Sequence, residues 1–290
     1  MKRVSAAAIA AFALLAALAL FLYFYGGNPP SQSPPPGGGA LEVVFIDVGQ
    51  AESILLKHNG RYALIDAGES KTAKALTGFL KNEGVERLDF VIATHPHSDH
   101  IGGMEAVIRA FDIDVFIMPD IENDTKTFEN MVDALLEKDV RVAIPVPGDV
   151  YTLGEAELTI LFNQITPKSL NNCSVVSRLT FGALSVLFTG DMESEVEAAL
   201  LLTGRPVRSD FLNVAHHGSS TSSTQEFLSA VAPGAAFISC GVSNSYNHPH
   251  VNTITKLTGM GAAIYRTDED GTVRLILSPD GKYDVEVSGK

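Results

Sequence analysis

Three histidines and one aspartate lie within six positions of the chain, at His95, His97, Asp99 and His100. They follow an apolar run, residues 88–93, that predicts a buried strand. A loop at the end of a strand can direct four such side chains into one small volume. Imidazole nitrogens and carboxylate oxygens suit Zn²⁺, Mn²⁺ or Fe²⁺, and so dense a set can hold two cations. The alternative is a polar turn with hydrogen-bonded histidines, but this spacing favours a metal site.

Further polar side chains follow other predicted strands. Asp66 comes directly after the apolar residues 61–65, and Asp191 follows the run 184–189. Asp191 could instead cap a helix that begins near Glu193. If these strand ends meet at one edge, both carboxylates lie near the histidine loop.

The second half of the chain adds three more candidate histidines. The pair His216 and His217 ends an apolar segment, whereas His248 lies in the Asn-rich loop 244–250. Loops of this kind often carry function. The alternatives are a surface pair for His216 and His217 and a plain surface histidine for His248.

The elements that must position these residues form two comparable halves that divide near Pro147. Apolar runs and turn residues predict strands over 41–46, 53–56, 61–65, 88–93, 115–118, 140–144, 157–162, 174–180, 184–189, 211–215, 235–239, 262–265 and 272–277. Helical spacing predicts helices over 71–83, 104–111, 123–138, 193–203, 223–231 and 252–260. The sequence therefore predicts an α/β fold of two sheets with helices outside and the site at the seam where strand ends meet.

The amino terminus has a different character. Lys2 and Arg3 precede an uninterrupted apolar run over residues 4–25, which is long enough to cross a bilayer. The basic residues before it predict a single-pass cell-membrane anchor with the body of the chain outside the cytoplasm. A cleaved signal peptide is the alternative, and it would give a secreted protein. Residues 26–39, rich in Pro and Gly, predict an extended linker, and residues 40–290 form the folded domain.

Charge and cysteine content limit the possible partners. The chain has 21 basic and 34 acidic side chains, for a net charge of −13, which disfavours a nucleic-acid scaffold but leaves room for a nuclease. The two cysteines, Cys173 and Cys240, could form one disulfide, but we expect free thiols. No obligate protein partner is predicted.

Taken together, these motifs resemble the metallo-β-lactamase superfamily, whose fold is an αββα sandwich. More narrowly, the sequence resembles the hydrolase domain of the competence protein ComEC over nearly all of residues 41–277. The many-helix channel of full ComEC is not found in the sequence, so we expect a stand-alone relative on one anchor. The segments that carry the resemblance are Asp47-Val48-Gly49-Gln50, Leu64-Ile65-Asp66-Ala67-Gly68, residues 94–103, Asn171-Asn172-Cys173-Ser174, Leu187-Phe188-Thr189-Gly190-Asp191, His216-His217-Gly218-Ser219, Asn247-His248-Pro249 and Tyr265-Arg266-Thr267-Asp268.

The resemblance implies two divalent metal ions, Zn or Mn. It assigns His95 and His97 to the first ion, Asp99, His100 and His216 to the second, and Asp191 to both. Asp66 is expected to support the histidine loop through hydrogen bonds. His217 and His248 remain for substrate, and together with Asp99 they are the candidate catalytic residues.

The sequence departs from the family pattern at two places. Many members supply another histidine to the first metal, but here that slot holds Asn171 and Asn172, an arrangement typical of the ComEC-like subgroup. Ala51 and Glu52 stand where the subgroup usually has Gly-Asp. The missing histidine predicts weaker binding of the first metal ion.

The leading functional hypothesis is an extracytoplasmic phosphodiesterase or DNase that uses a hydroxide activated by the two metals, with single-stranded DNA as a candidate substrate. A second hypothesis keeps the hydrolase but changes the substrate to a β-lactam, a lactone or a choline-phosphate ester. A third is a metal-stabilised binding module without turnover, suggested by the missing histidine.

Overall fold

The computed structural model describes residues 39–163 and 169–290. The apolar segment 4–25, expected to be a helix, and nearly all of the linker lie outside these described residues. Within the described ranges, no helix combines the length and apolarity needed to cross a bilayer.

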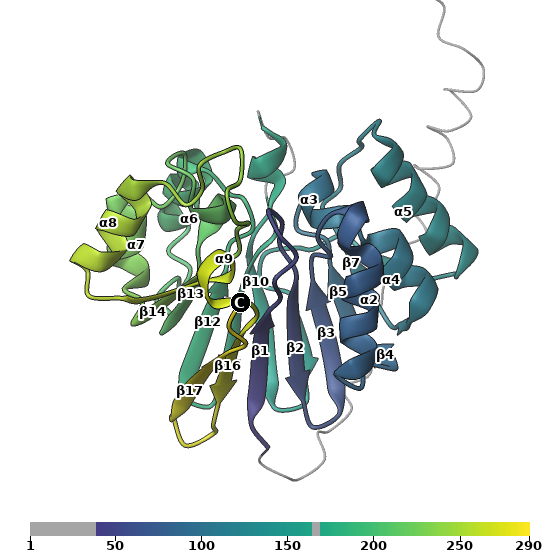
Figure 1. Ribbon diagram of the computed structural model, residues 1–290, viewed down its shortest axis with the longest axis horizontal. Coiled ribbons are helices and arrows are strands. Elements are labelled where there is room, and N and C mark those ends of the chain that lie inside the picture. The colour runs from purple at the N-terminus through teal and green to yellow at the C-terminus, as the bar shows by residue number, and fades with distance from the viewer. Residues whose placement is uncertain (1–38, 164–168) are drawn as a thin grey trace, which may run out of the picture. The chain divides into compact units, whose positions relative to one another are not determined.

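The first sheet has eight strands in the order β17-β16-β1-β2-β3-β5-β7-β8 (Figure 1). Their bounds are β1 Leu41–Phe45, β2 Ile54–His58, β3 Arg61–Ile65, β5 Phe90–Ile92, β7 Phe116–Ile117, β8 Val142–Ala143, β16 Val273–Leu277 and β17 Tyr283–Val287. The pairs from β17 to β3 are antiparallel, and those from β3 to β8 are parallel. The expected hairpin joins β2 to β3 through Asn59 and Gly60, which both have positive φ.

The second sheet has seven strands in the order β15-β14-β13-β12-β11-β10-β9. They are β9 Val150–Leu153, β10 Ala156–Phe162, β11 Val176–Phe181, β12 Leu184–Phe188, β13 Phe211–Asn213, β14 Ala235–Ile238 and β15 Ala263–Arg266. The strands from β12 to β15 are parallel, so their carboxyl ends lie on one edge. A small separate sheet pairs β4 (Arg87–Leu88) with β6 (Asp112–Ile113).

Helices cover the outer face of each sheet (Figure 1). The first sheet packs against α2 (Ala73–Asn82), α4 (Met104–Ala110) and α5 (Lys126–Glu137). The second packs against α6 (Ser194–Leu202), α7 (Gln225–Val231) and α8 (Val251–Gly259). The remaining short elements are η1 Ser70–Thr72, α3 Ser98–Ile101, η2 Leu170–Cys173, η3 Ala215–Gly218 and α9 Thr267–Asp270.

A third apolar layer lies between the two sheets. It combines inward side chains of both, and the Phe45 ring stacks on Phe237 with centroids 4.4 Å apart. Burial of these large side chains on both faces of each sheet is the main stabilising contribution to such a sandwich. The expected α/β sandwich is therefore confirmed for the described residues. Cys173 and Cys240 are both buried and unpaired, as expected.

The division into two halves holds less well at the carboxyl end. Strand β16 pairs with β1, so the last part of the chain returns to the first sheet instead of finishing the second. Neither β9 nor β17 is expected from the sequence. The return has a physical reason, because β1 would otherwise expose a long unpaired edge beside a buried face.

The histidine loop packs backbone against backbone on the loop that follows β3. The Ala67 amide donates to the His100 carbonyl oxygen at 2.7 Å, and the Gly103 amide donates to the Gly68 carbonyl oxygen at 3.0 Å. A Cβ atom at Gly103 would collide with the Ala67 carbonyl oxygen. This close approach requires glycine at the start of α4.

We predict that Gly103→Ala lowers the free energy of unfolding by about 1–3 kcal/mol, because the backbone cannot make room without displacing the histidine loop. Gly78→Ala is the matched control. Gly78 lies inside α2 with no atom within 4 Å of an added Cβ, so alanine should stabilise the helix by about 0.5–1 kcal/mol. Urea unfolding of the full chain, followed by far-UV circular dichroism, measures both. Equal effects of the two substitutions would contradict this account of Gly103.

Candidate metal centre

The first group of candidate ligands lies where β5 ends. Strand β5 is fully buried, and His97 is the N-cap residue of the short helix α3, which carries Asp99 and His100. His95 and His100 are buried, with 1% and 0% exposure. The strand therefore delivers polar side chains directly to the edge of the core.

Asp191 enters the same volume from the second sheet. It follows β12, is 2% exposed, and its amide donates to the Ser174 hydroxyl at 3.0 Å. The N-cap residue of α6 is Glu193, so Asp191 does not cap that helix. The carboxylate is thus free to face the histidines.

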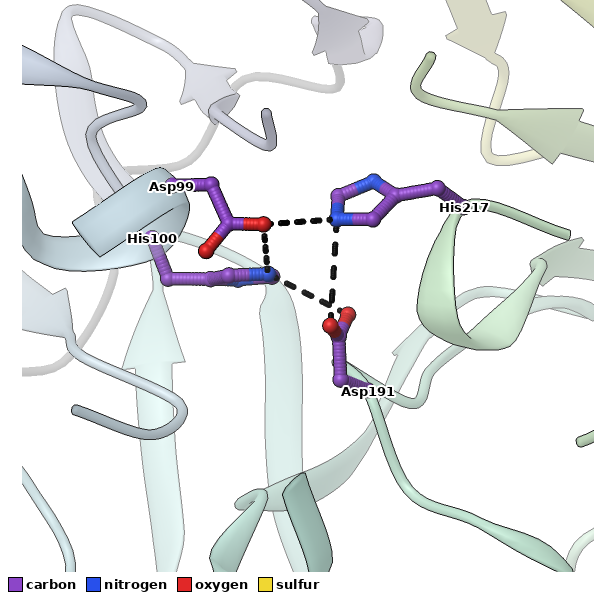
Figure 2. Close-up of side chains that lie close together, drawn as sticks. All are labelled: Asp99, His100, Asp191 and His217. Carbon is purple, nitrogen blue, oxygen red and sulfur yellow. Dashed lines mark ion pairs between the residues drawn. The ribbon is translucent and has the colours of Figure 1, made fainter. Parts of the chain in front are cut away.

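Two clusters of donor atoms share the Asp191 carboxylate. Cluster A comprises Asp99, His100, Asp191 and His217, and cluster B comprises His95, His97 and Asp191. Within each, one ligand atom per residue lies within 4.8 Å of all the others. Figure 2 shows the four side chains of cluster A pointing toward one another, with His100 Nε2 at 3.2 Å from Asp191 Oδ1 and His217 Nε2 at 3.3 Å from Asp99 Oδ2.

The structure differs from the sequence expectation at the adjacent histidines. His217, which was expected to contact substrate, belongs to cluster A, whereas His216, the expected ligand, belongs to neither cluster. His216 Nδ1 lies 3.1 Å from Thr221 Oγ1, and its Nε2 lies 3.7 Å from Asp191 Oδ2. Both residues have positive φ, 53° and 54°, and this turn sends the second ring into the cluster.

The hydrogen bonds of the histidines fit metal binding. His217 Nδ1 lies 2.8 Å from the Ser239 carbonyl oxygen, which only accepts, so Nδ1 carries a proton. His100 Nδ1 is likewise 2.6 Å from Asp66 Oδ2. The Nε2 atoms of His100 and His217 are buried and face Asp191 Oδ1 and Asp99 Oδ2 at 3.2 and 3.3 Å without forming a well-aligned hydrogen bond. Buried imidazole nitrogens and carboxylate oxygens that converge in this way are the donors that divalent ions prefer, so the residues present fit a metal.

Asp66 holds the histidine loop from behind, as expected. It is completely buried, and its Oδ1 accepts from the Thr94 amide at 2.8 Å. Its Oδ2 accepts from the Thr94 hydroxyl at 2.6 Å as well as from His100. The Thr94 hydroxyl lies 3.1 Å from His95 Nδ1, so one carboxylate orients both buried imidazoles.

Charges inside the site are strongly coupled. Burial would raise the pKa of Asp191, but His100 and His217 hold it well below its ordinary value. Burial would lower the pKa of His217, but Asp191 and Asp99 raise it to about 9. Burial and neighbouring His100 keep the pKa of His95 well below normal. Protons on His100 and His217 thus provide the positive charge that metal ions would otherwise supply, and binding an ion would release them.

Glu52 is a buried residue of the site that sequence reasoning left without a role. It is 3% exposed, its Oε2 accepts from Asn213 Nδ2 at 2.7 Å, and Oε1 has no partner. Burial raises its pKa to about 7. Glu52, Asp66 and His100 form a third group with ligand-forming atoms within 4.8 Å. The only feature of the sequence that singles out Glu52 is that Ala51 and Glu52 stand where the ComEC-like subgroup usually has Gly-Asp.

The slot without a histidine carries an unpaired amide oxygen. Asn171 is 8% exposed, and its Oδ1 has no hydrogen-bond partner. The neighbouring Asn172 uses its Oδ1 to accept from the Glu193 amide at 3.0 Å. Asn171 therefore keeps a buried acceptor without a partner, whereas Asn172 supports the start of α6.

A cavity of about 280 Å³ opens onto the clusters. Among the described residues its lining contains no Lys or Arg, and it consists of Gln50, His97, Ser98, Asp99, Asn171, Asp191, His216, His217, Tyr246 and His248. His248 is 9% exposed and is therefore not a plain surface histidine. All eight candidate residues named from the sequence meet at this site.

Comparison with known proteins gives the same picture. Relatives include ComE operon protein 3 of Bacillus subtilis, 30% identical over 252 residues, covering 80% of this chain and 32% of the relative. Competence protein ComA of Neisseria gonorrhoeae is 30% identical over 241 residues, covering 81% and 32%. The chain thus spans about a third of the length of these relatives.

Solved structures agree on the fold. The metallo-beta-lactamase fold protein YhfI from Bacillus subtilis superposes with a TM-score of 0.55 at 16% identity, covering 86% of this chain and 100% of that one. The diiron β-hydroxylase CmlA from Streptomyces venezuelae gives 0.54 at 15% identity, covering 90% and 59%. At these identities the likeness concerns the fold alone. Residues 46–242 match the family model of the metallo-beta-lactamase superfamily, and with competence proteins of the ComEC type as relatives, the chain belongs to that superfamily.

Proposed function

We propose that the chain is a metal-dependent phosphodiesterase that acts outside the cytoplasm, with single-stranded DNA as its first candidate substrate. The observation that carries this proposal is the Asp191 carboxylate shared by two donor clusters at the floor of an open cavity. DNA is favoured by the relatives, one of which is named a competence protein. Residues 4–25 are proposed to anchor the domain to the membrane.

Two divalent ions, Zn or Mn, are proposed to occupy the clusters. Cluster A would hold one ion through Asp99, His100 and His217, cluster B would hold the other through His95 and His97, and Asp191 would contact both. The unpaired Oδ1 of Asn171 is a neutral candidate ligand in place of the missing histidine. When bound, such ions polarise a phosphoryl oxygen and lower the pKa of water.

The roles of the chain's own residues follow from their surroundings. The pKa of Asp99 is held below its ordinary value, against its burial, by His217 and His100, so the carboxylate is ionised at neutral pH and can accept a hydrogen bond from the attacking water. His216 lines the cavity with Nε2 near Asp191 and is a candidate substrate contact in place of His217. His248 is the proposed hydrogen-bond donor to the substrate.

The charge of the substrate must be met without basic side chains. Because the described lining contains neither Lys nor Arg, the negative charge of a phosphodiester would be balanced by the bound ions and by neutral donors. This arrangement suits local recognition of one phosphodiester group better than extended electrostatic binding along a nucleic-acid backbone.

Activity tests the proposal directly. The purified full chain, loaded with Mn²⁺ or Zn²⁺, should hydrolyse at least one of single-stranded DNA, a dinucleotide and bis-p-nitrophenyl phosphate, and Asp191→Asn should abolish the turnover. Metal content, measured on the same samples, separates the outcomes. A chain with bound metal and no turnover of any phosphodiester would exclude the proposal. Hydrolysis of nitrocefin would then favour a β-lactamase, and little metal without activity would favour a binding module.

Because His217 and not His216 belongs to cluster A, variants of these two histidines should differ in metal content. His217→Ala should remove one equivalent of metal per chain, because cluster A loses a ligand, whereas His216→Ala should retain the wild-type content. Inductively coupled plasma mass spectrometry after dialysis measures both variants. Circular dichroism on both verifies that each is folded. Greater metal loss in His216→Ala would restore the assignment expected from the sequence.

Asp66 is predicted to control metal affinity without touching the metal. Asp66→Asn should weaken affinity for Zn²⁺ about 10–100-fold, because an amide has a single oxygen and cannot accept from the Thr94 amide on one side and from His100 on the other, as the two carboxylate oxygens do. Competition with a chromophoric chelator gives the dissociation constant. Asp210→Asn is the control, since Asp210 accepts from Ser185 near the opposite end of β12. An unchanged constant in Asp66→Asn would show that the imidazoles are oriented by other contacts.

A further inference from the structure

We propose that Gln50 is a positioning residue that fixes the tautomer of His248, so that His248 presents an N–H donor from Nε2 to an anionic oxygen of the substrate. The inference rests on the proposed function for the identity of that oxygen, a non-bridging oxygen of a phosphodiester. The tautomer itself follows from contacts that do not depend on it.

The orientation of the Gln50 side chain is set by the backbone of another loop. The Gly241 amide donates to Gln50 Oε1 at 3.0 Å, and a backbone N–H can only donate. The oxygen of the Gln50 amide must therefore face Gly241. The backbones of Gly241 and Gln50 approach closely here. A Cβ atom added to Gly241 would lie only 2.6 Å from the backbone nitrogen of Gln50.

With the oxygen fixed, the Gln50 NH₂ group faces His248. Gln50 Nε2 lies 3.4 Å from His248 Nδ1, and an amide NH₂ group only donates. His248 Nδ1 must accept this bond and carries no proton. In the neutral ring the proton then resides on Nε2. Because His248 lines the cavity, this Nε2–H group is the donor available to a substrate.

The backbone of His248 is held in place independently. Asn244 Nδ2 donates to the His248 carbonyl oxygen at 2.6 Å, and the His248 amide donates to Asn244 Oδ1 at 2.9 Å. The exposed ring of Tyr246 stacks on the imidazole, with centroids 5.6 Å apart. The ring is therefore fixed in position as well as in tautomer.

This hydrogen bonding is opposite to that of the metal-binding histidines. In His100 and His217 the Nδ1 atom faces an acceptor, so once the ring is neutral, as it must be to bind an ion, Nε2 keeps its lone pair. In His248 the Nδ1 atom faces a donor, so Nε2 keeps a proton. A nitrogen with a proton cannot bind a cation, but it can donate to an oxyanion. The contrast separates substrate-facing from metal-facing imidazoles within one cavity.

A neutral imidazole has a defined tautomer, whereas a protonated one donates from both nitrogens. The neutral state is therefore the one in which Gln50 decides what His248 offers.

Substitution of Gln50 tests the inference. In Gln50→Glu, one carboxylate oxygen can still accept from Gly241, but the other now accepts from His248 and draws the proton to Nδ1. We expect ¹⁵N NMR of the Zn²⁺-loaded full chain, labelled at its eight histidines, to show His248 protonated at Nε2 in the wild type and at Nδ1 in the variant. Loss of its signals in His248→Ala assigns the resonance. Phosphodiester turnover should fall about 100-fold, as for removal of one oxyanion donor.

Two controls separate this role from a general effect of charge or folding. Gln225→Glu makes the same exchange on α7, where Gln225 Nε2 donates to the Ser229 hydroxyl, and should change neither tautomer nor turnover. In a His248→Ala background, Gln50→Glu should cause no further loss of turnover. A wild-type His248 protonated at Nδ1, an unchanged tautomer in Gln50→Glu, or a full additional loss in the double variant would overturn the inference. If the wild type cleaves no phosphodiester, the proposed function fails, but the NMR result still decides the role of Gln50.

Discussion

The structure depends on one constraint, the burial of several charged side chains around the Asp191 carboxylate. Asp191 comes from the second sheet and His100 from the first, and their contact at 3.2 Å crosses the seam between the sheets. Burying a carboxylate is costly unless positive groups compensate it, so the two halves must be held in register at this point. The three apolar layers provide that rigidity, and the short loops at the strand ends bring the charges together.

What each imidazole can do is decided by the group behind it. A carboxylate behind His100 and a carbonyl oxygen behind His217 hold the proton of the neutral ring on Nδ1, which leaves Nε2 as the nitrogen that can donate a lone pair to a cation. The amide group of Gln50 behind His248 leaves Nε2 with a proton. Residues outside the candidate ligands and substrate contacts therefore set the chemistry that each imidazole can perform. Such partners lie in other strands and loops, so the sandwich determines function through its hydrogen bonds as much as through its ligands.

Much of this arrangement can be predicted from sequence, because it is encoded locally. The apolar strand before His95 and the strand before Asp191 each place polar residues at a carboxyl end, and these positions hold in the structure. Choosing between His216 and His217 is different, since it depends on a turn of two successive residues in the left-handed region, after which the second ring and not the first belongs to cluster A. The pairing of β16 with β1 also escapes local patterns, because it joins segments from the two ends of the domain. The role of Glu52 could not be predicted for the same reason, since its hydrogen-bond partner, Asn213, lies far away in the sequence, in the second sheet.

The acidity of the chain and the composition of the cavity together restrict how an anion can enter. With a net charge of −13, the protein repels a polyanion at long range, and the described cavity lining has no Lys or Arg to offset this. For the proposed anionic substrate, attraction would therefore arise at short range, from the cations proposed at the clusters and from neutral donors such as His248. Neutral donors retain their strength at high salt, whereas surface charges are screened. An anionic substrate would consequently be selected by geometry at the clusters, where the group that binds an ion can also accept from His248.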